Sequence, residues 1–309
     1  MTPGVLDTIV LTFVTALQRG FGILQQFSVP LLGAFAVLAL LSTLLPVLAT
    51  GALWGNAVAV VLLNLVKIGG MYFFLLHFYP WAIGALEVFL TWGMAPSGGV
   101  LTVQDFLRPS TILETGLRVA FPLIQFAANL GVVGTIVQSP FLVLYGLLYL
   151  VVVACFCWMA FSVIFTLIEY HLAVMTGAVL VPFGILTQTA MFAEFALGWI
   201  CGGLIRSLLT ATLLGIAVPL FRDVRIVTAP GSDPTLLSAA VATGVSLLFA
   251  YMVFTIPQKA ALVGGRGMAL GLGSGLHAVT GWRAVGTAGA MLGTVGSGVV
   301  RGASALLRR

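Results

Sequence analysis

One apolar segment constrains the fold of this chain more than any other part of its sequence. Residues 140–168 contain no charged side chain, and at about 1.5 Å per helical residue they exceed the roughly 30 Å hydrocarbon core of a bilayer. The whole chain is 61% hydrophobic and 7% charged, whereas a soluble globular domain carries roughly 25% charged residues. The sequence therefore predicts an all-α polytopic membrane protein.

Four further apolar segments are long enough to cross a bilayer as helices. Before them, apolar side chains recur at spacings of three and four over residues 5–27, which predicts an amphipathic helix. It carries few Lys and Arg residues, so we expect it to pack along neighbouring subunits rather than lie on the membrane surface. The predicted spans cover residues 31–50, 56–76, 140–168, 197–221 and 236–256.

The segment 172–188 decides between five spans and six. It contains Pro182, Phe183 and Gly184, a helix-breaking turn in apolar surroundings. If the segment crosses the membrane completely, the chain has six spans; if it dips in and returns at the turn, it has five. Irregular backbone at membrane depth requires protein or water to satisfy its polar groups. We expect about five spans, with residues 167–215 forming a re-entrant or broken helical hairpin.

Charge and composition divide the chain into five regions. Acidic and basic residues nearly cancel in region 79–139, so the positive-inside rule allows its export. Thr111 and Glu114 have the spacing of a capping box there. The Gly-rich, basic end of the chain predicts a cytoplasmic tail in contact with anionic lipid or nucleic acid. The regions are an amphipathic helix (1–29), two spans (30–78), a periplasmic loop with short helices (79–139), a transmembrane core (140–257) and the tail (258–309).

Four titratable side chains interrupt the apolar sequence of the central hairpin: Glu169, His171, Glu194 and Arg206. An ionised group inside a bilayer costs a few kcal/mol or more unless it is paired or wetted. Glu194 and Arg206 are twelve residues apart, about 18 Å along one continuous helix, so a direct pair would require a break in the helix or another subunit. We expect these charges to form structural ion pairs, join subunits or line a passage.

Lys67 lies within the second predicted span. Its ammonium group either snorkels toward the interface, while the stem covers apolar surface, or faces a lumen. In the fourth predicted span, Gly198, Gly202 and Gly203 predict a helix face that packs closely against its neighbours.

Several kinds of enzyme are excluded by what the sequence lacks. It has no phosphate-cradling G-x-x-x-x-G-K-[ST] loop and no His-Glu-x-x-His motif. Cys155 and Cys157 point to different faces of one helix, which supports neither a disulfide framework nor a zinc site. The sequence therefore indicates a protein that is not an enzyme and needs no cofactor or metal.

Four features follow one another in the centre of the chain. Glu-Tyr-His at 169–171 ends a long apolar segment, Leu-Val-Pro-Phe-Gly follows at 180–184, Phe-Ala-Glu comes at 192–194, and a small-residue helix covers 198–215. This order resembles that of the TrbL-type inner-membrane proteins of conjugative type IV secretion systems. The resemblance extends to the amphipathic N-terminus, the long central loop and the Gly-rich tail. Members of that family often carry a longer hydrophilic C-terminal region than this chain does.

The resemblance implies a channel or scaffold subunit in the bacterial inner membrane, at the base of the translocation apparatus. Such a subunit helps to pass DNA with a bound relaxase and to assemble the pilus or stalk. Lys67 and Arg206 are then the candidates for facing a DNA path. The implied partners are further copies of the chain, periplasmic stalk or minor pilin subunits, other inner-membrane secretion components, cytoplasmic ATPases, transferred single-stranded DNA with its relaxase, and lipids.

Two other functions are compatible with the same residues. A stand-alone ion-coupled transporter would use Glu169, Glu194 and Arg206 as intramembrane charges, although the spans show no obvious inverted repeat. A passive membrane scaffold would need no conduit of its own.

Overall fold

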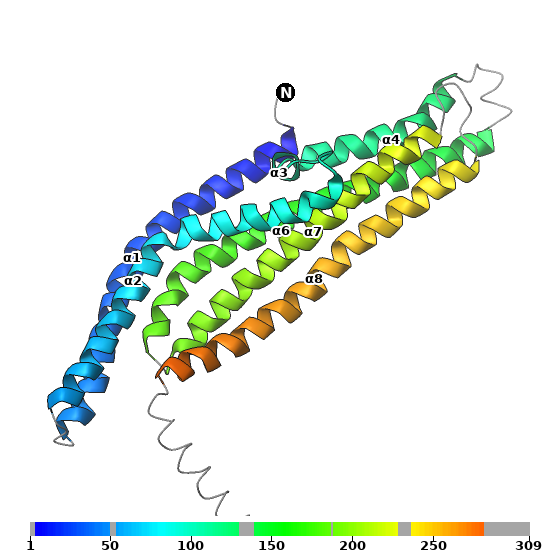
Figure 1. Cartoon of the computed structure of the whole chain (residues 1–309). Coiled ribbons are helices and arrows are strands. Elements are labelled where there is room, and N and C mark those ends of the chain that lie inside the picture. The colour runs from blue at the N-terminus through cyan, green and yellow to red at the C-terminus, as the bar shows by residue number, and fades with distance from the viewer. Residues whose placement is uncertain (1–3, 50–53, 130–138, 187, 228–235, 281–309) are drawn as a thin grey trace, which may run out of the picture.

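The computed structural model describes residues 4–49, 54–129, 139–186, 188–227 and 236–280. These residues form seven α-helices and two short 3-10 helices, with no strand among them. Figure 1 shows an elongated bundle whose long helices run side by side. The elements are α1 (Val5–Ala49), α2 (Trp54–Met94), η1 (Ala95–Ser97), α3 (Val103–Phe106), α4 (Pro109–Asn129), α6 (Ser139–Leu180), η2 (Val181–Ile185), α7 (Ala190–Val227) and α8 (Leu236–Thr280).

Five of the described helices are long and apolar enough to cross a membrane, namely α1, α2, α6, α7 and α8. This confirms the predicted all-α polytopic fold with five spans. The five helices have 38 to 45 residues, which corresponds to about 57 to 68 Å, roughly twice the thickness of the hydrocarbon core. Each helix is therefore longer than the apolar segment from which it was predicted.

The first helix joins two regions that the sequence analysis separates. α1 runs from the predicted amphipathic helix at 5–27 into the predicted span at 31–50 without a break, and Pro30 lies inside it. Membrane helices tolerate proline because neighbouring helices and local adjustments satisfy the backbone groups that it leaves free. Val10 and Phe21 on the amphipathic half belong to the hydrophobic core. This half of α1 is therefore part of the bundle.

The predicted loop at 79–139 is largely helical where it is described. α2 continues to Met94, and α4 contributes 21 residues. The expectation of a capping box at Thr111 and Glu114 is wrong, because α4 begins two residues before Thr111. The capping box lies at Thr102 and Asp105, where each residue's side chain accepts a hydrogen bond from the other's backbone N–H.

One carboxylate joins the beginning of α1 to the beginning of α4. Asp7 accepts hydrogen bonds from the backbone N–H of Ser110 (3.0 Å) and from the Ser110 hydroxyl. Ser110 lies in the first turn of α4, where backbone N–H groups have no partner within the helix and an anion is favoured. The N-terminal helix and the central 79–139 region are therefore packed together.

α6 and α7 form a hairpin closed by η2. Residues 172–180 are the end of α6 rather than a separate crossing. The α-helix ends just before Pro182, which has no backbone N–H to donate, and α7 begins at Ala190. The broken helical hairpin expected at Pro182, Phe183 and Gly184 is therefore present, with α-helices much longer than expected on both sides.

α8 lies against α7 along much of its length (Figure 1). It continues beyond the predicted span at 236–256 to Thr280, so the first part of the predicted tail at 258–309 is helical. The rest of that tail, residues 281–309, lies outside the described residues.

Close contacts between helices form the core. Tyr170 of α6 is fully buried, and its hydroxyl donates a hydrogen bond to the carbonyl oxygen of Ala82 on α2 at 2.6 Å. Where α2 meets α7, a Cβ atom added to Gly93 would lie 2.6 Å from the carbonyl oxygen of Leu208. Glycine at this position allows the two backbones to approach closely.

One part of the molecule is hardly covered. The rings of Phe35 and Phe183 are 4.7 Å apart, so the α6–α7 turn meets α1 well before that helix ends. The later part of α1 and the early part of α2 extend past the turn (Figure 1); we call these residues, 36–49 and 54–66, the α1–α2 arm. Among the arm residues whose side chains the structure describes, Leu45, Leu63 and Val66 are 63%, 70% and 66% exposed. These residues present apolar surface to their surroundings. Along α2, the most apolar window has only 11% of its residues buried, against 56% in that of α6.

Candidate functional site

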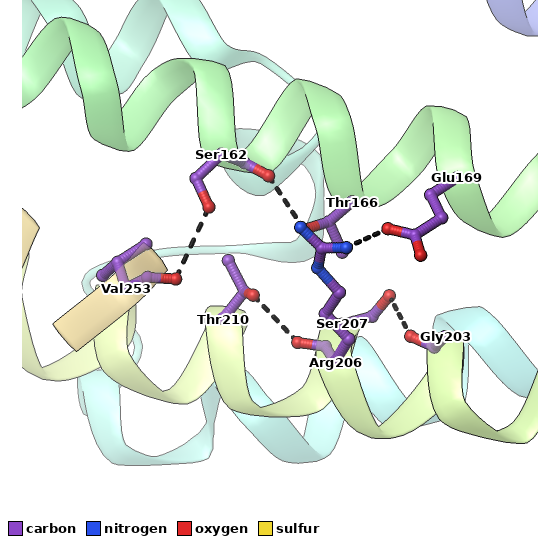
Figure 2. A network of polar contacts seen from close by, with 8 residues as sticks. All are labelled: Ser162, Thr166, Glu169, Gly203, Arg206, Ser207, Thr210 and Val253. Carbon is purple, nitrogen blue, oxygen red and sulfur yellow. Dashed lines mark hydrogen bonds and ion pairs between the residues drawn. The ribbon is translucent and has the colours of Figure 1, made fainter. Parts of the chain in front are cut away.

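Two of the charged residues expected in the hairpin form an ion pair. Arg206 on α7 donates from Nη1 to Oε2 of Glu169 on α6, as Figure 2 shows. The Arg206 side chain is 8% exposed and that of Glu169 31%. The turn at η2 brings together residues that are 37 positions apart. One of the expected roles, a structural ion pair within the protomer, is therefore observed.

Buried hydroxyl groups surround this ion pair. The hydroxyl of Ser162 on α6 donates to the carbonyl oxygen of Val253 on α8 at 3.5 Å and links these two helices. Other hydroxyls donate to a carbonyl oxygen one turn back in their own helix, as in Thr166 to Ser162, Ser207 to Gly203 and Thr210 to Arg206 (Figure 2). Because each of these four hydroxyl groups has an acceptor, the polar layer leaves none of these buried donors unsatisfied.

A pocket of about 340 Å³ opens beside the ion pair, between α6 and α8. The carbon at the centre of the Arg206 guanidinium lies 5.7 Å from the centre of the Phe165 ring, close enough for a cation–π contact. Arg206 therefore contacts the Glu169 carboxylate on one side and the aromatic pocket on the other. The pocket is lined by Trp158, Phe161, Ser162, Phe165, Arg206, Phe254 and Gln258.

Lys67 lies against the turn of the hairpin. Its ammonium group donates a hydrogen bond to the carbonyl oxygen of Ile185, at the end of η2, with an Nζ–O distance of 2.7 Å. The hydroxyl of Thr189 donates in the same way to the carbonyl oxygen of Phe183 at 2.8 Å. The broken backbone thus obtains the partners that it needs in apolar surroundings, and Lys67 fixes the turn to α2.

A Lys67→Met variant tests this contact. Methionine keeps a long apolar stem but leaves the Ile185 carbonyl oxygen without its charged donor, so we expect the bundle to lose about 1 kcal/mol of unfolding free energy. Denaturant titration of the purified protein in detergent measures this. Lys259→Met is the matched control, because Lys259 is exposed on α8. Equal stability of both variants would show that the contact contributes nothing.

The other two titratable residues of the hairpin are not part of the ion pair. His171 is buried, and its Nδ1 lies 2.8 Å from the carbonyl oxygen of Leu167 in its own helix. Glu194 is partly exposed near the beginning of α7 and forms no ion pair or hydrogen bond within the described residues. The carboxylate that pairs with Arg206 is Glu169, in agreement with the distance argument against Glu194.

The three predicted packing glycines, Gly198, Gly202 and Gly203, are buried. A Cβ atom added to Gly203 would lie 3.0 Å from Cδ2 of Tyr170 on α6. A tighter position that was not predicted is Gly116 on α4, where an added Cβ would lie 2.3 Å from Cγ of Phe156. Gly116 is followed four residues later by a small residue, Ala120, but such spacings are too frequent among 37 glycines to single it out.

No metal site is formed in the described ranges, which contain no group of three or more His, Cys, Asp or Glu side chains able to hold an ion. The fold and the site define a polytopic helical membrane protein in which apolar helices enclose a paired charge and a hydroxyl-lined layer.

The chain belongs to the TrbL/VirB6 plasmid conjugal transfer protein family, whose model matches residues 47–256. The match includes the ion pair, the turn, all of α2, α6 and α7 and the first part of α8, but of α1 only its last three residues, 47–49. It confirms the resemblance found in the sequence and makes this chain a membrane protein of conjugal transfer, related to type IV secretion. Comparison with curated proteins gave no match.

Proposed function

We propose that the chain is a channel or scaffold subunit of a conjugative type IV secretion system in the bacterial inner membrane. Several copies would assist translocation of the DNA–protein substrate and assembly of the pilus or stalk. The observation that carries this proposal is the family match across most of the bundle. The poorly covered apolar surface of α2 supports it, because large apolar surfaces on membrane proteins are covered either by lipid or by other protein.

The proposed arrangement places the C-terminal tail in the cytoplasm, where its basic residues face the anionic leaflet. Region 79–139 then lies in the periplasm together with the beginning of α1, since Asp7 and Ser110 join them. The proposed partners at that end are periplasmic stalk or minor pilin subunits. Cytoplasmic ATPases and other inner-membrane secretion components would supply energy and complete the apparatus, and single-stranded DNA with its relaxase would make transient contact.

The residues that line any passage are a separate part of the proposal. Lys67 and Glu169 have partners inside the protomer, and Arg206 keeps guanidinium N–H groups beyond the one that binds Glu169. We keep these three, with His171 and Glu194, as candidates for lumen or intersubunit charges. DNA in transit that crosslinks at position 67 or 206 would support a lumen.

A transfer assay tests the proposed role of the N-terminal half of α1. Deletion of residues 5–27 should abolish conjugal transfer by a donor strain that depends on this chain, while the apolar rest of α1 still inserts into the membrane. Because the deletion also removes core residues, a second variant keeps the helix. Ile23→Ala combined with Phe27→Ala changes two exposed side chains one turn apart, and should reduce transfer without lowering the amount of membrane-inserted protein.

Leu237→Ala on α8 is the control for this experiment, since Leu237 is also exposed but lies far from α1 in the sequence. Normal transfer by both the deletion and the double variant would contradict the assignment. An ion flux through vesicles that contain this chain alone, lost on Glu194→Gln, would instead favour the ion-coupled transporter. Transfer that needs the chain but no DNA contact with it would favour the passive scaffold.

A further inference from the structure

The aromatic pocket beside Arg206 has the features of a binding site. Trp158, Phe161 and Phe165 follow one face of α6, and Phe254 and Gln258 lie one turn apart on α8. The volume of about 340 Å³ falls within the roughly 300 to 1,000 Å³ of small-molecule pockets. We propose that this pocket binds an anionic phospholipid, with an acyl chain against the aromatic walls and the phosphate at Arg206 and Gln258.

The direction in which the pocket opens favours a lipid acyl chain. Trp158 is 52% exposed and Phe165 65% exposed, although both line the pocket. The pocket therefore opens on the outside of the bundle. On a protein that crosses a membrane this is the side where acyl chains lie, and an apolar hollow is not filled by water.

The polar groups of the pocket favour a phosphate. Arg206 uses Nη1 for Glu169, and its guanidinium has five N–H donors in all. The remaining donors form no hydrogen bond within the described residues. A guanidinium group binds phosphate oxygens through parallel N–H groups. The partly exposed side-chain amide of Gln258 adds further donors on the α8 side.

Charge favours an anionic lipid. Arg206 is the one charged side chain among the residues that line the pocket, and its partner Glu169 is not among them. Exposed Lys259 follows Gln258 on α8, and a lysine stem allows its ammonium group to reach a lipid headgroup. The proposal depends on the chain lying in a membrane and not on its role in secretion.

Tryptophan fluorescence tests the proposal on the full-length chain. The chain has six Trp residues, and a variant that keeps only Trp158 reports on the pocket. A second variant that keeps only Trp92, which is exposed on α2 outside the pocket, reports on surrounding lipid. Each is reconstituted in mixed phosphatidylcholine and phosphatidylglycerol vesicles, in which either lipid carries brominated, quenching acyl chains.

We expect the brominated anionic lipid to be preferred about fivefold at Trp158, as one cationic side chain near a membrane surface provides, and to show no preference at Trp92. Glu169→Gln combined with Arg206→Gln should remove the preference without leaving an unpaired charge. Gln258→Leu combined with Lys259→Gln, which changes no core residue, should weaken it. Equal quenching of Trp158 and Trp92 by the two lipids would overturn the proposal, as would a preference that survives in both double variants.

Discussion

Glu169→Ala should lower the free energy of unfolding by about 3 kcal/mol, the lower end of what removing one partner of a buried ion pair costs. The lower end applies because the Glu169 side chain is 31% exposed, whereas that of Arg206 is 8% exposed. The variant leaves the buried Arg206 guanidinium charged and without its carboxylate, with only neutral hydroxyl and aromatic groups around it. Denaturant titration in detergent measures the loss, and conjugal transfer should fall with the amount of folded protein.

Two controls distinguish the effect of breaking the ion pair from the effect of losing a carboxylate alone. Glu169→Met combined with Arg206→Met removes both charges and should recover most of the lost stability, because well-packed apolar side chains replace buried ion pairs at little cost. Glu114→Ala breaks the exposed pair with Arg118, whose side chains are 61% and 69% exposed, and should cost at most about 1 kcal/mol. A double variant as unstable as Glu169→Ala would show that the pair is not coupled.

Gly93→Ala should destabilise the bundle by about 1 to 3 kcal/mol, as overpacking of a well-packed core does. The added Cβ would lie 2.6 Å from the carbonyl oxygen of Leu208 and 2.7 Å from Cβ of Ala211. The closest atom belongs to the backbone of α7, so a side-chain rotation cannot relieve the contact. The measurement is the midpoint of denaturant unfolding in detergent, with membrane insertion checked separately.

Gly84→Ala is the matched control on the same helix. No atom lies within 4 Å of the Cβ that would be added to Gly84, and replacing glycine by alanine inside a helix stabilises it by roughly 0.5 to 1 kcal/mol. The two variants make the same chemical change at different contacts. Similar midpoints for both would contradict the close α2–α7 approach.

The class of fold and the position of the turn were predictable because both depend on local sequence. Apolar length predicts a span, and Pro182 with Gly184 two residues later predicts a turn, whereas a proline alone does not, since Pro30 and Pro80 lie inside helices. The ends of the helices were not predictable in the same way. Backbone hydrogen bonds continue past the apolar segment, so α1 passes through Pro30 and α2 reaches Met94. Hydropathy therefore predicts which part of a helix can lie in lipid, but not the residues at which the helix begins and ends.

The partners of the charged residues depend on contacts between distant parts of the chain. Glu194 and Arg206 are twelve residues apart on the continuous helix α7, which keeps them apart within one protomer, but choosing Glu169 required the register of α6 against α7, which the sequence does not contain. The partner of Lys67 is a backbone carbonyl, and every residue has one, so no side-chain pattern indicates it. The charged candidates could therefore be predicted from the sequence, but their contacts depend on the packing of the helices.

The contact between Lys67 and Ile185 also has a consequence for synthesis. The two residues are 118 positions apart, so at about 5 to 20 residues per second the ribosome needs roughly 6 to 24 s to make the second after the first. During that time the ammonium group of Lys67 has to reach water or lipid headgroups, which its flexible stem allows. Lys67 therefore has no partner at η2 while the α1–α2 hairpin is being made, and obtains it only after the later hairpin has been synthesised.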